Sequence, residues 1–210
     1  MPYSKAHKAQ TRAKIVEAAT HAFREEGIGG VGIPAVMRQA GLTHGGFYAH
    51  FESKDDLVAA ACDAGYAESV ARLRRRAARL AHDDVVPSLM KSYLSPAHRD
   101  SPASGCTIAA LAGDITRAPA DVRAAFTRGL ADYAQELGTY LPASAGDTAD
   151  HKTDEALVLL AGMAGALLLA RAVDDPHMSE RILDAAHDFY ARSLGEQSGH
   201  ESARADLRKL

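Results

Sequence analysis

The chain has 210 residues, of which 47% are hydrophobic and 24% are charged, and its net charge is −3. This length and mixture are typical of one or two folded domains and exclude a chain that is disordered throughout. The two cysteines, Cys62 and Cys106, cannot form a framework of disulfide bonds, and no Cys/His spacing indicates a zinc site. The N-terminal residues contain no apolar signal region, so we expect a cytoplasmic protein.

Charge is distributed unevenly along the chain. Residues 1–81 contain twelve Lys or Arg and eight Asp or Glu, a net of +4, which leaves −7 for the remainder. A basic N-terminal part on an acidic body favours contact between that end and a polyanion. The alternative is an ordinary solvated face, because charge alone does not specify nucleic acid.

The N-terminal residues predict a first helix that Gly27 ends, since glycine is common just after a helix C-terminus. Five apolar residues fall on one stripe at helical spacing. These are Ile15, Ala18, Ala19, Ala22 and Phe23.

A second helix is predicted from Pro34, which suits a first helical turn, to Gly41, which stops the helix. Its expected inward positions are Val36, Met37 and Ala40.

Two further helix starts follow. Thr43 is a favourable N-cap for a very short third helix, and Ser53 is a favourable N-cap for a long fourth one. Asp55 and Asp56 would lie in the first turn of the fourth helix, where negative charge suits the helix dipole.

The remainder also predicts helices, because no stretch alternates with period two as a strand does. We expect loops at 95–105 and 142–150, a buried apolar helix at 156–170 and a last helix at about 179–194. The apolar stretch is shorter than the roughly 20 residues that cross a bilayer. The prediction is an all-α fold of about eight or nine helices.

Residues 33–57 predict a helix, a tight turn and a second helix. Gly41 can take the positive φ of the turn, and Leu42 and Phe47 can pin the short helix to its neighbours. Gly45 and Gly46 leave the surface bare for a close partner. A short helix presented in this way suits the major groove of DNA, where the N-terminal residues of a recognition helix face base edges.

This stretch resembles the DNA-binding domain of the TetR (tetracycline-repressor-like) transcriptional regulators, over about residues 10–57. The family pattern is Ala-Gly-Val/Leu-Ser/Thr-x-Gly-x-x-Tyr-x-His/Tyr-Phe-x-Ser/Thr-Lys-x-x-Leu. The matching residues are Ala40, Gly41, Leu42, Thr43, Gly45, Tyr48, His50, Phe51, Ser53, Lys54 and Leu57.

The resemblance implies an all-α protein with a three-helix helix-turn-helix domain and a basic arm at 1–54. A larger helical ligand-binding and dimerisation domain would occupy 55–194, and 195–210 would form a polar tail. The expected partners are double-stranded DNA at a palindromic operator, a second copy of the chain and a small-molecule effector. No membrane, metal or cofactor is expected.

By resemblance, Thr43, Tyr48 and Lys54 would hold phosphates and His44 would lie nearest the bases, while His50 and Phe51 would be structural. The family often has Ser or Thr in place of Gly32, so one phosphate contact is absent or is supplied by Arg38. The predicted DNA-binding residues are Lys5, Lys8, Arg12, Arg38, Thr43, His44, Gly45, Gly46, Tyr48 and Lys54.

An effector pocket is expected among the central helices, and its apolar composition favours an apolar or aromatic ligand. The alternative is that these positions are plain core. The candidates are Met90, Tyr93, Leu94, Cys106, Ile108, Leu111, Phe126, Leu130, Tyr133, Leu137, Met163 and Leu167.

The apolar helix at 156–170 and the last helix could form a four-helix dimer interface with the same helices of a second copy. The alternative is that they are core helices of a monomer. The predicted interface residues are Leu157, Leu160, Gly162, Gly165, Leu168, Ile182, Ala186 and Tyr190.

Cys106 follows a loop and lies where a helix starts, a position that stabilises a thiolate. The Gly-Cys pair also resembles a TetR subgroup in which some members respond to electrophiles or oxidants. The alternative is a small, buried and inert cysteine, and Cys62 is predicted to be structural.

The sequence thus predicts a ligand-responsive homodimeric regulator, a repressor released by a small apolar or aromatic effector or by modification of Cys106. The alternative is a helical small-molecule or redox-binding module with a degenerate DNA-binding domain. No enzyme is expected, because the chain lacks a phosphate-binding loop, a nucleophile elbow and histidines at catalytic spacing.

Overall fold

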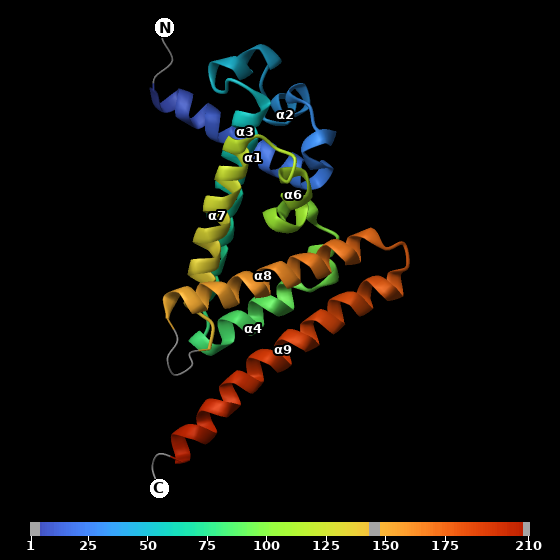
Figure 1. Ribbon diagram of the computed structural model, residues 1–210. Helices are drawn as coiled ribbons and strands as arrows, with labels where there is room; N and C mark the ends of the chain where they lie inside the picture. Colours follow the sequence, from blue (N-terminus) through green and yellow to red (C-terminus); the bar gives the residue numbers. More distant parts are fainter. Residues whose placement is uncertain (1–4, 143–147, 208–210) are drawn as a thin grey trace. The chain divides into compact units, whose positions relative to one another are not determined.

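The computed structural model describes residues 5–142 and 148–207, with side chains described up to residue 195 (Figure 1). Every regular element within these ranges is helical, which confirms the predicted all-α fold. The chain forms two compact units. Unit 1 consists of Met1–Ser69 and Ser101–Leu130, and unit 2 of Val70–Asp100 and Ala131–Leu210.

Unit 1 begins with α1 (Lys5–Gly30), in which Gly27 breaks the helix with φ 76° and ψ 163°. A positive φ of this size suits glycine, which has no Cβ to clash with the backbone. The break confirms the predicted end of the first continuous helix at Gly27, although a short helical piece follows. The predicted stripe of Ile15, Phe23 and the alanines between them is buried.

The second helix, α2 (Ile33–Gln39), has Pro34 in its first turn and Gly32 at its N-cap without a side-chain capping bond. Val36 and Met37 are buried as predicted, while Ala40 is half-buried. Gly41 has φ 72° and directs the chain into the turn, as its place in the sequence predicts.

The third element, η1 (His44–Ala49), is a 3₁₀-helix with Thr43 at its N-cap position. Thr43 is therefore at the predicted N-cap position, although its side chain makes no capping hydrogen bond. Phe47 instead anchors η1, because its ring is fully buried and stacks on Phe51 at 5.6 Å between ring centroids.

The long helix α3 (Lys54–Ala77) contributes its first part to unit 1 and the rest to unit 2. Ser53 Oγ accepts a hydrogen bond from the Asp56 amide at 3.0 Å, which confirms Ser53 as its cap. Asp55 and Asp56 lie in the first turn, where their charge stabilises the helix dipole.

Unit 1 is completed by η2 (Pro102–Ser104), α6 (Thr107–Ile115) and the first part of α7 (Ala120–Gly138). These elements share one apolar core with the N-terminal helices, in which Leu111 and Val122 are buried together with Phe23 and Leu57. The interval 95–105 therefore holds two short helices, α5 and η2, instead of the continuous loop that we expected.

Unit 2 contains α4 (His82–Tyr93), α5 (Pro96–Arg99), α8 (Ala149–Ala172) and α9 (Pro176–Leu207), with the remaining parts of α3 and α7. Figure 1 shows α8 and α9 running antiparallel beside one another. The last helix begins at Pro176 and continues to Leu207, so the polar residues from 195 to 207 continue this helix.

The apolar helix α8 is buried on one side only. Leu160, Met163 and Leu167 are buried, whereas Val158 and Leu169 are 66% and 58% exposed. Within one subunit, the predicted buried helix therefore leaves part of its apolar surface exposed. By length and composition α8 also meets the minimum for crossing a bilayer, a test that core helices of water-soluble proteins pass as well.

Candidate nucleic-acid interface

Tyr48 on η1 is an exposed aromatic side chain of unit 1, and 65% of its surface is accessible to solvent. Its ring lies edge-on to the buried Phe47 at 5.2 Å and to His44 at 6.3 Å between centroids. Phe47 thus fixes the backbone beneath two exposed hydrogen-bonding side chains. Gly45 is exposed beside them and adds no side chain to the surface.

Arg38 and Thr43 flank this exposed face of η1. Arg38 lies in the last turn of α2 and Thr43 at the N-cap of η1, and both are exposed. Gly46 differs from Gly45, because it is half-buried and a Cβ there would lie 3.7 Å from the Met37 methyl group. Gly46 is therefore a packing position as well as part of the predicted surface.

The three basic residues near the N-terminus lie on a helix. Lys5, Lys8 and Arg12 are exposed on α1, three and four residues apart, which places them on one helical face. The expectation of a mobile basic arm is therefore wrong for these residues. The Arg12 guanidinium lies 4.6 Å from the centroid of the Phe51 ring, and this cation–π contact joins the basic face to the residues that follow η1.

His50 lies next to this basic face. Burial, followed by the positive charges of Lys8 and Arg12, lowers the pKa of His50. The neutral form of His50 is therefore favoured, and the local positive charge comes from Lys8 and Arg12.

Lys54 faces the protein interior. Its Nζ donates a hydrogen bond to the Ile28 carbonyl oxygen at 2.6 Å and lies 6.0 Å from the centroid of the Phe23 ring. The family pattern implies a phosphate contact for this lysine, and nothing in its spacing indicates the intramolecular bond.

Arg24 is a buried charged residue that the sequence analysis did not single out. It is buried, forms an ion pair with Glu68 at 3.0 Å and donates to the Thr107 hydroxyl at 3.2 Å and the Gly65 carbonyl at 3.3 Å. A buried arginine requires such partners, because an unpaired buried charge is costly. Its position beside Phe23 in an apolar stripe is the sequence feature that could have predicted its burial.

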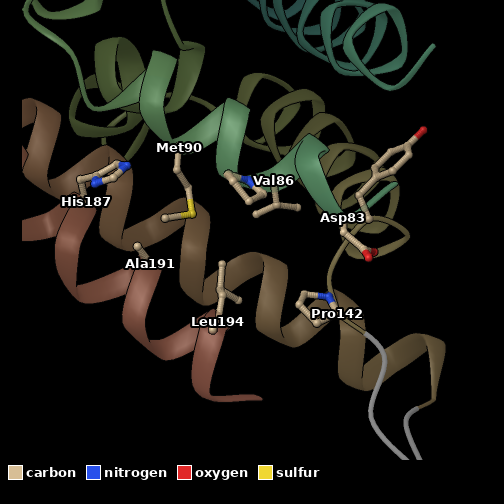
Figure 2. Close-up of a pocket in the computed structure, with 10 residues that line it drawn as sticks. Asp83, Val86, Met90, Pro142, His187, Ala191 and Leu194 are labelled. Carbon is tan, nitrogen blue, oxygen red and sulfur yellow. The ribbon is translucent and has the colours of Figure 1, made fainter. Parts of the chain in front are cut away.

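Unit 2 contains a pocket of about 570 Å³ between α4, the end of α7 and α9 (Figure 2). In Figure 2, Val86 and Met90 on α4 lie opposite Ala191 and Leu194 on α9, with His187 at one end. The pocket is mainly apolar with a few polar groups at its rim. The residues that line it are Asp83, Val86, Pro87, Met90, Tyr140, Pro142, His187, Ala191, Leu194 and Gly195.

The predicted pocket residues are distributed over both units. In unit 1, Leu111 is buried in the apolar core against which Phe126 packs, and Cys106 is buried at the N-cap of α6. Ile108 and Leu130 also belong to unit 1. Met90 lines the pocket of unit 2. The other predicted residues of unit 2 are Tyr93, Leu94, Tyr133, Leu137, Met163 and Leu167, and they are buried in its helices.

The exposed apolar face of α8 and α9 differs from the predicted dimer interface. Leu160 is fully buried within the subunit, and Gly162 faces the Tyr190 hydroxyl, so Gly162 is used in packing α8 on α9. Leu157, Ile182 and Ala186 are half-buried, whereas Gly165 and Leu168 are exposed. The large apolar side chains that α8 and α9 expose are Val158, Leu168, Leu169, Met178 and Phe189.

Sequence comparison links the N-terminal helices to known regulators. Residues 15–61 match the family described as bacterial regulatory proteins, tetR family. Two HTH-type transcriptional regulators of Pseudomonas putida, TtgR and the probable regulator ArpR, are each 41% identical over 54 residues, which is 26% of this chain. The chain matches about a quarter of the length of these relatives, since the match covers 26% of each.

Solved structures extend the likeness to most of the chain. The reduced form of NemR from E. coli is similar with a TM-score of 0.70 and 21% identity, over 86% of this chain and 94% of that one. A TetR transcriptional regulator from Chloroflexus aurantiacus is similar with a TM-score of 0.69 and 24% identity, over 90% and 96%. At these identities the likeness shows the fold.

A short helix held by a buried phenylalanine behind a glycine turn has the geometry of a helix-turn-helix motif. The match to the tetR family of bacterial regulatory proteins covers residues 15–61, and the fold similarity to solved structures extends over most of the chain.

Proposed function

We propose that the protein is a homodimeric repressor that binds a palindromic operator and leaves it when a small molecule binds. The observation that carries this proposal is the exposed face of η1 beside basic residues of α1 and α2. His44 and Gly45 would lie nearest the base edges, and Tyr48 would hold a phosphate. Phosphate contacts position a protein on DNA, whereas base contacts specify the sequence. The DNA backbone would be contacted by Lys5, Lys8, Arg12, Arg38, Thr43 and Gly46.

Dimerisation is proposed through the exposed apolar face of α8 and α9. Val158, Leu168 and Phe189 are 66%, 54% and 59% exposed, although such side chains gain about 1.5–3 kcal/mol each from full burial. The same face of a second copy would cover them around a twofold axis, and two subunits would supply two reading heads for two half-sites. The need for this cover also explains why α8 is apolar enough to resemble a membrane span.

An effector is proposed for the pocket of unit 2. Its volume of about 570 Å³ lies in the range of sites for drug-sized ligands, and Val86, Met90 and Leu194 make its walls apolar. His187 and Tyr140 would orient an apolar or aromatic molecule. Modification of Cys106 is the second proposed trigger, supported by its place at the N-cap of α6.

We assign the proposed functions to the predicted domains. Residues 1–54 would bind DNA, residues 55–194 would bind effector and partner, and the end of α9 would extend beyond them. The protein would act in the cytoplasm without catalysing a reaction. The alternative, a small-molecule or redox-binding module with a degenerate DNA-binding domain, keeps the pocket or Cys106 and lacks salt-sensitive operator binding.

A fluorescence anisotropy titration of the full chain against DNA upstream of its own coding region, at several salt concentrations, tests operator binding. Arg38→Ala should weaken binding and reduce the salt slope by about 0.9, the value for one lost phosphate contact. Arg123→Ala, an exposed arginine of α7, is the matched control. Binding that is weak and insensitive to salt would favour the degenerate module.

The pocket can be tested with the neutral aromatic dye N-phenyl-1-naphthylamine. Its fluorescence should rise on binding, and Ala191→Trp should abolish the rise by filling the pocket. Ala131→Trp, at an exposed position of α7, should leave it unchanged. Equal dye binding by both variants would mean that the dye binds outside the pocket of unit 2.

A further inference from the structure

The backbone of Ile28 is bound on both sides by charged side chains from other helices. Asp114 Oδ2, in the last turn of α6, accepts a hydrogen bond from the Ile28 amide at 2.8 Å. Lys54 Nζ, at the first residue of α3, donates to the Ile28 carbonyl oxygen at 2.6 Å. An anion meets the donor and a cation meets the acceptor, so both bonds are of the stronger, charge-assisted kind. We call these three residues the Ile28 clamp.

Gly27 makes this arrangement possible. Its φ of 76° interrupts α1 and turns the next residue towards its two partners. A Cβ at this position would lie 3.1 Å from Asp114 Oδ2, so a side chain would be strained by its φ and crowded by the carboxylate. The glycine thus allows α6 to approach the end of α1.

A second tie joins α6 to α1 at the opposite end of α6. Arg24, four residues before Ile28, donates to the Thr107 hydroxyl in the first turn of α6 at 3.2 Å. It also forms an ion pair with Glu68 of α3 at 3.0 Å. Helix α6 is therefore fastened to α1 at both of its ends, and both ties include a side chain of α3.

We propose that Asp114 is a positioning residue for DNA binding, which acts through the Ile28 clamp without touching DNA. The clamp joins α6 to the helices that carry the reading face, since α1 packs on α2 and α2 packs on η1. This inference rests on the proposed DNA binding and names the element of unit 1 on which operator affinity depends.

The clamp also makes operator affinity depend steeply on the position of α6. A hydrogen bond of 2.8 Å is lost at about 3.6 Å, so a shift of α6 by roughly 1 Å releases the Ile28 amide. A trigger that moves α6, such as a modification at its N-cap residue Cys106, would be felt at the end of α1.

The test compares Asp114→Ala with a charge-matched control in operator titrations at several salt concentrations. Removal of a negative charge by itself strengthens DNA binding, because DNA is a polyanion. The clamp predicts the opposite sign for Asp114→Ala, a loss of about tenfold, with the salt slope unchanged because no phosphate contact is lost. Asp132→Ala, an exposed carboxylate of α7, should bind as tightly as wild type or slightly tighter.

A conservative variant separates positioning from a general loss of stability. Asp114→Asn keeps an oxygen that accepts from the Ile28 amide, so it should recover most of the affinity. Binding by Asp114→Ala that equals or exceeds wild-type binding would overturn the proposal. Failure of Asp114→Asn to recover affinity while it retains the wild-type melting temperature would overturn it too.

A measurement without DNA tests the Ile28 clamp independently of the proposed DNA binding. Hydrogen exchange at the Ile28 amide, followed by NMR, should be slow in the wild type and at least tenfold faster in Asp114→Ala. Equal exchange in both proteins would overturn the clamp itself. Absence of operator binding by the wild type, with the exchange difference present, would reject the DNA-binding role and leave the clamp in place.

Discussion

The core of unit 1 and the α8–α9 pair of unit 2 are both built from apolar helices, yet they differ in how their apolar faces are covered. In unit 1, Phe23, Phe47 and Phe51 are buried by neighbouring elements of the same chain. In the α8–α9 pair, Leu168 and Phe189 remain more than half exposed. An apolar face that stays exposed within its own chain indicates that another molecule covers it. A core that is buried within one chain instead holds the exposed surface of η1 in a fixed shape.

The largest expected effect comes from placing a charge on the open face. Leu168→Glu should convert a dimer into a monomer and reduce operator affinity at least a hundredfold, because a monomer holds one half-site. The melting temperature measured in dilute protein should change little, since Leu168 is exposed within the subunit. Sedimentation velocity and anisotropy titrations measure the two effects. Leu80→Glu, at an exposed apolar residue outside the helices, is the control, and a Leu168→Glu dimer would contradict the proposed interface.

Truncation of one phenylalanine in each region sharpens the comparison. Phe47→Ala should lower the free energy of unfolding by about 3–5 kcal/mol, through lost burial and the cavity left behind. Phe189→Ala should leave the unfolding of the isolated subunit within about 0.5 kcal/mol, and should weaken only the association of subunits. Urea titrations at low and high protein concentration distinguish the two. A concentration-independent loss for Phe189→Ala would place that ring in the subunit core.

Lys54 tests a further contrast, between a direct contact with DNA and an indirect role in positioning η1. Lys54→Ala should lower operator affinity by about tenfold with an unchanged salt slope, because its ammonium is bound to the Ile28 carbonyl. Anisotropy titrations at several salt concentrations measure both quantities. A slope reduced by about 0.9 would instead assign Lys54 the phosphate contact that the family pattern implies.

A smaller effect concerns pH and unit 2. Burial, and the nearby charges of Arg171 and Arg72, lower the pKa of His98, although its Nδ1 lies 2.8 Å from the Tyr93 carbonyl oxygen. The unfolded chain, with a histidine pKa of about 6.5, then binds the proton more readily than the folded protein. This contribution to stability is complete above pH 6.5 and is lost as the pH falls below that value.

His98→Asn should therefore lose less stability than the wild type between pH 7.5 and pH 5.5, as measured by thermal unfolding. The lowered pKa of His50 acts in the same direction in both proteins and cancels in the comparison. An identical pH dependence in the two proteins would mean that His98 does not titrate in this range.

The smallest expected effect distinguishes the two cysteines. Burial raises the pKa of the Cys62 thiol to about 11, so very little of it is thiolate at pH 8. Iodoacetamide should leave Cys62 unmodified in the folded protein, and mass spectrometry of Cys106→Ser isolates this site. Rapid alkylation of Cys62 would mean that unit 1 opens at this part of its core.

Sequence reasoning succeeded where the signal is local. Gly41 at the turn, Pro34 in the first turn of α2 and Ser53 at the cap of α3 act on their immediate neighbours, so their roles follow from type and spacing. It failed where the partner is distant in sequence. Arg24 meets Thr107, and Ile28 meets Asp114, across more than eighty residues, and no spacing rule predicts such pairs.

The dimer face shows a different limit. Residues 156–170 are apolar on every side of the helix, so no stripe distinguishes the side that packs within the subunit from the side that faces outward. Leu160 and Gly162 were assigned to the interface, whereas Leu160 is buried within the subunit and Gly162 packs against Tyr190 of α9. For the DNA-binding residues, the structure adds exposure and neighbours, and their contacts with DNA stay predictions.

The open face of α8 and α9 has a consequence for gene dosage. When two subunits must meet before either half-site is held firmly, the active species rises with the square of the subunit concentration as long as monomers predominate. A cell that halves its supply of this regulator would then lose about three quarters of the operator-competent form. The apolar face would in this way make the switch sensitive to how much of the protein is present, as well as to what the protein has bound.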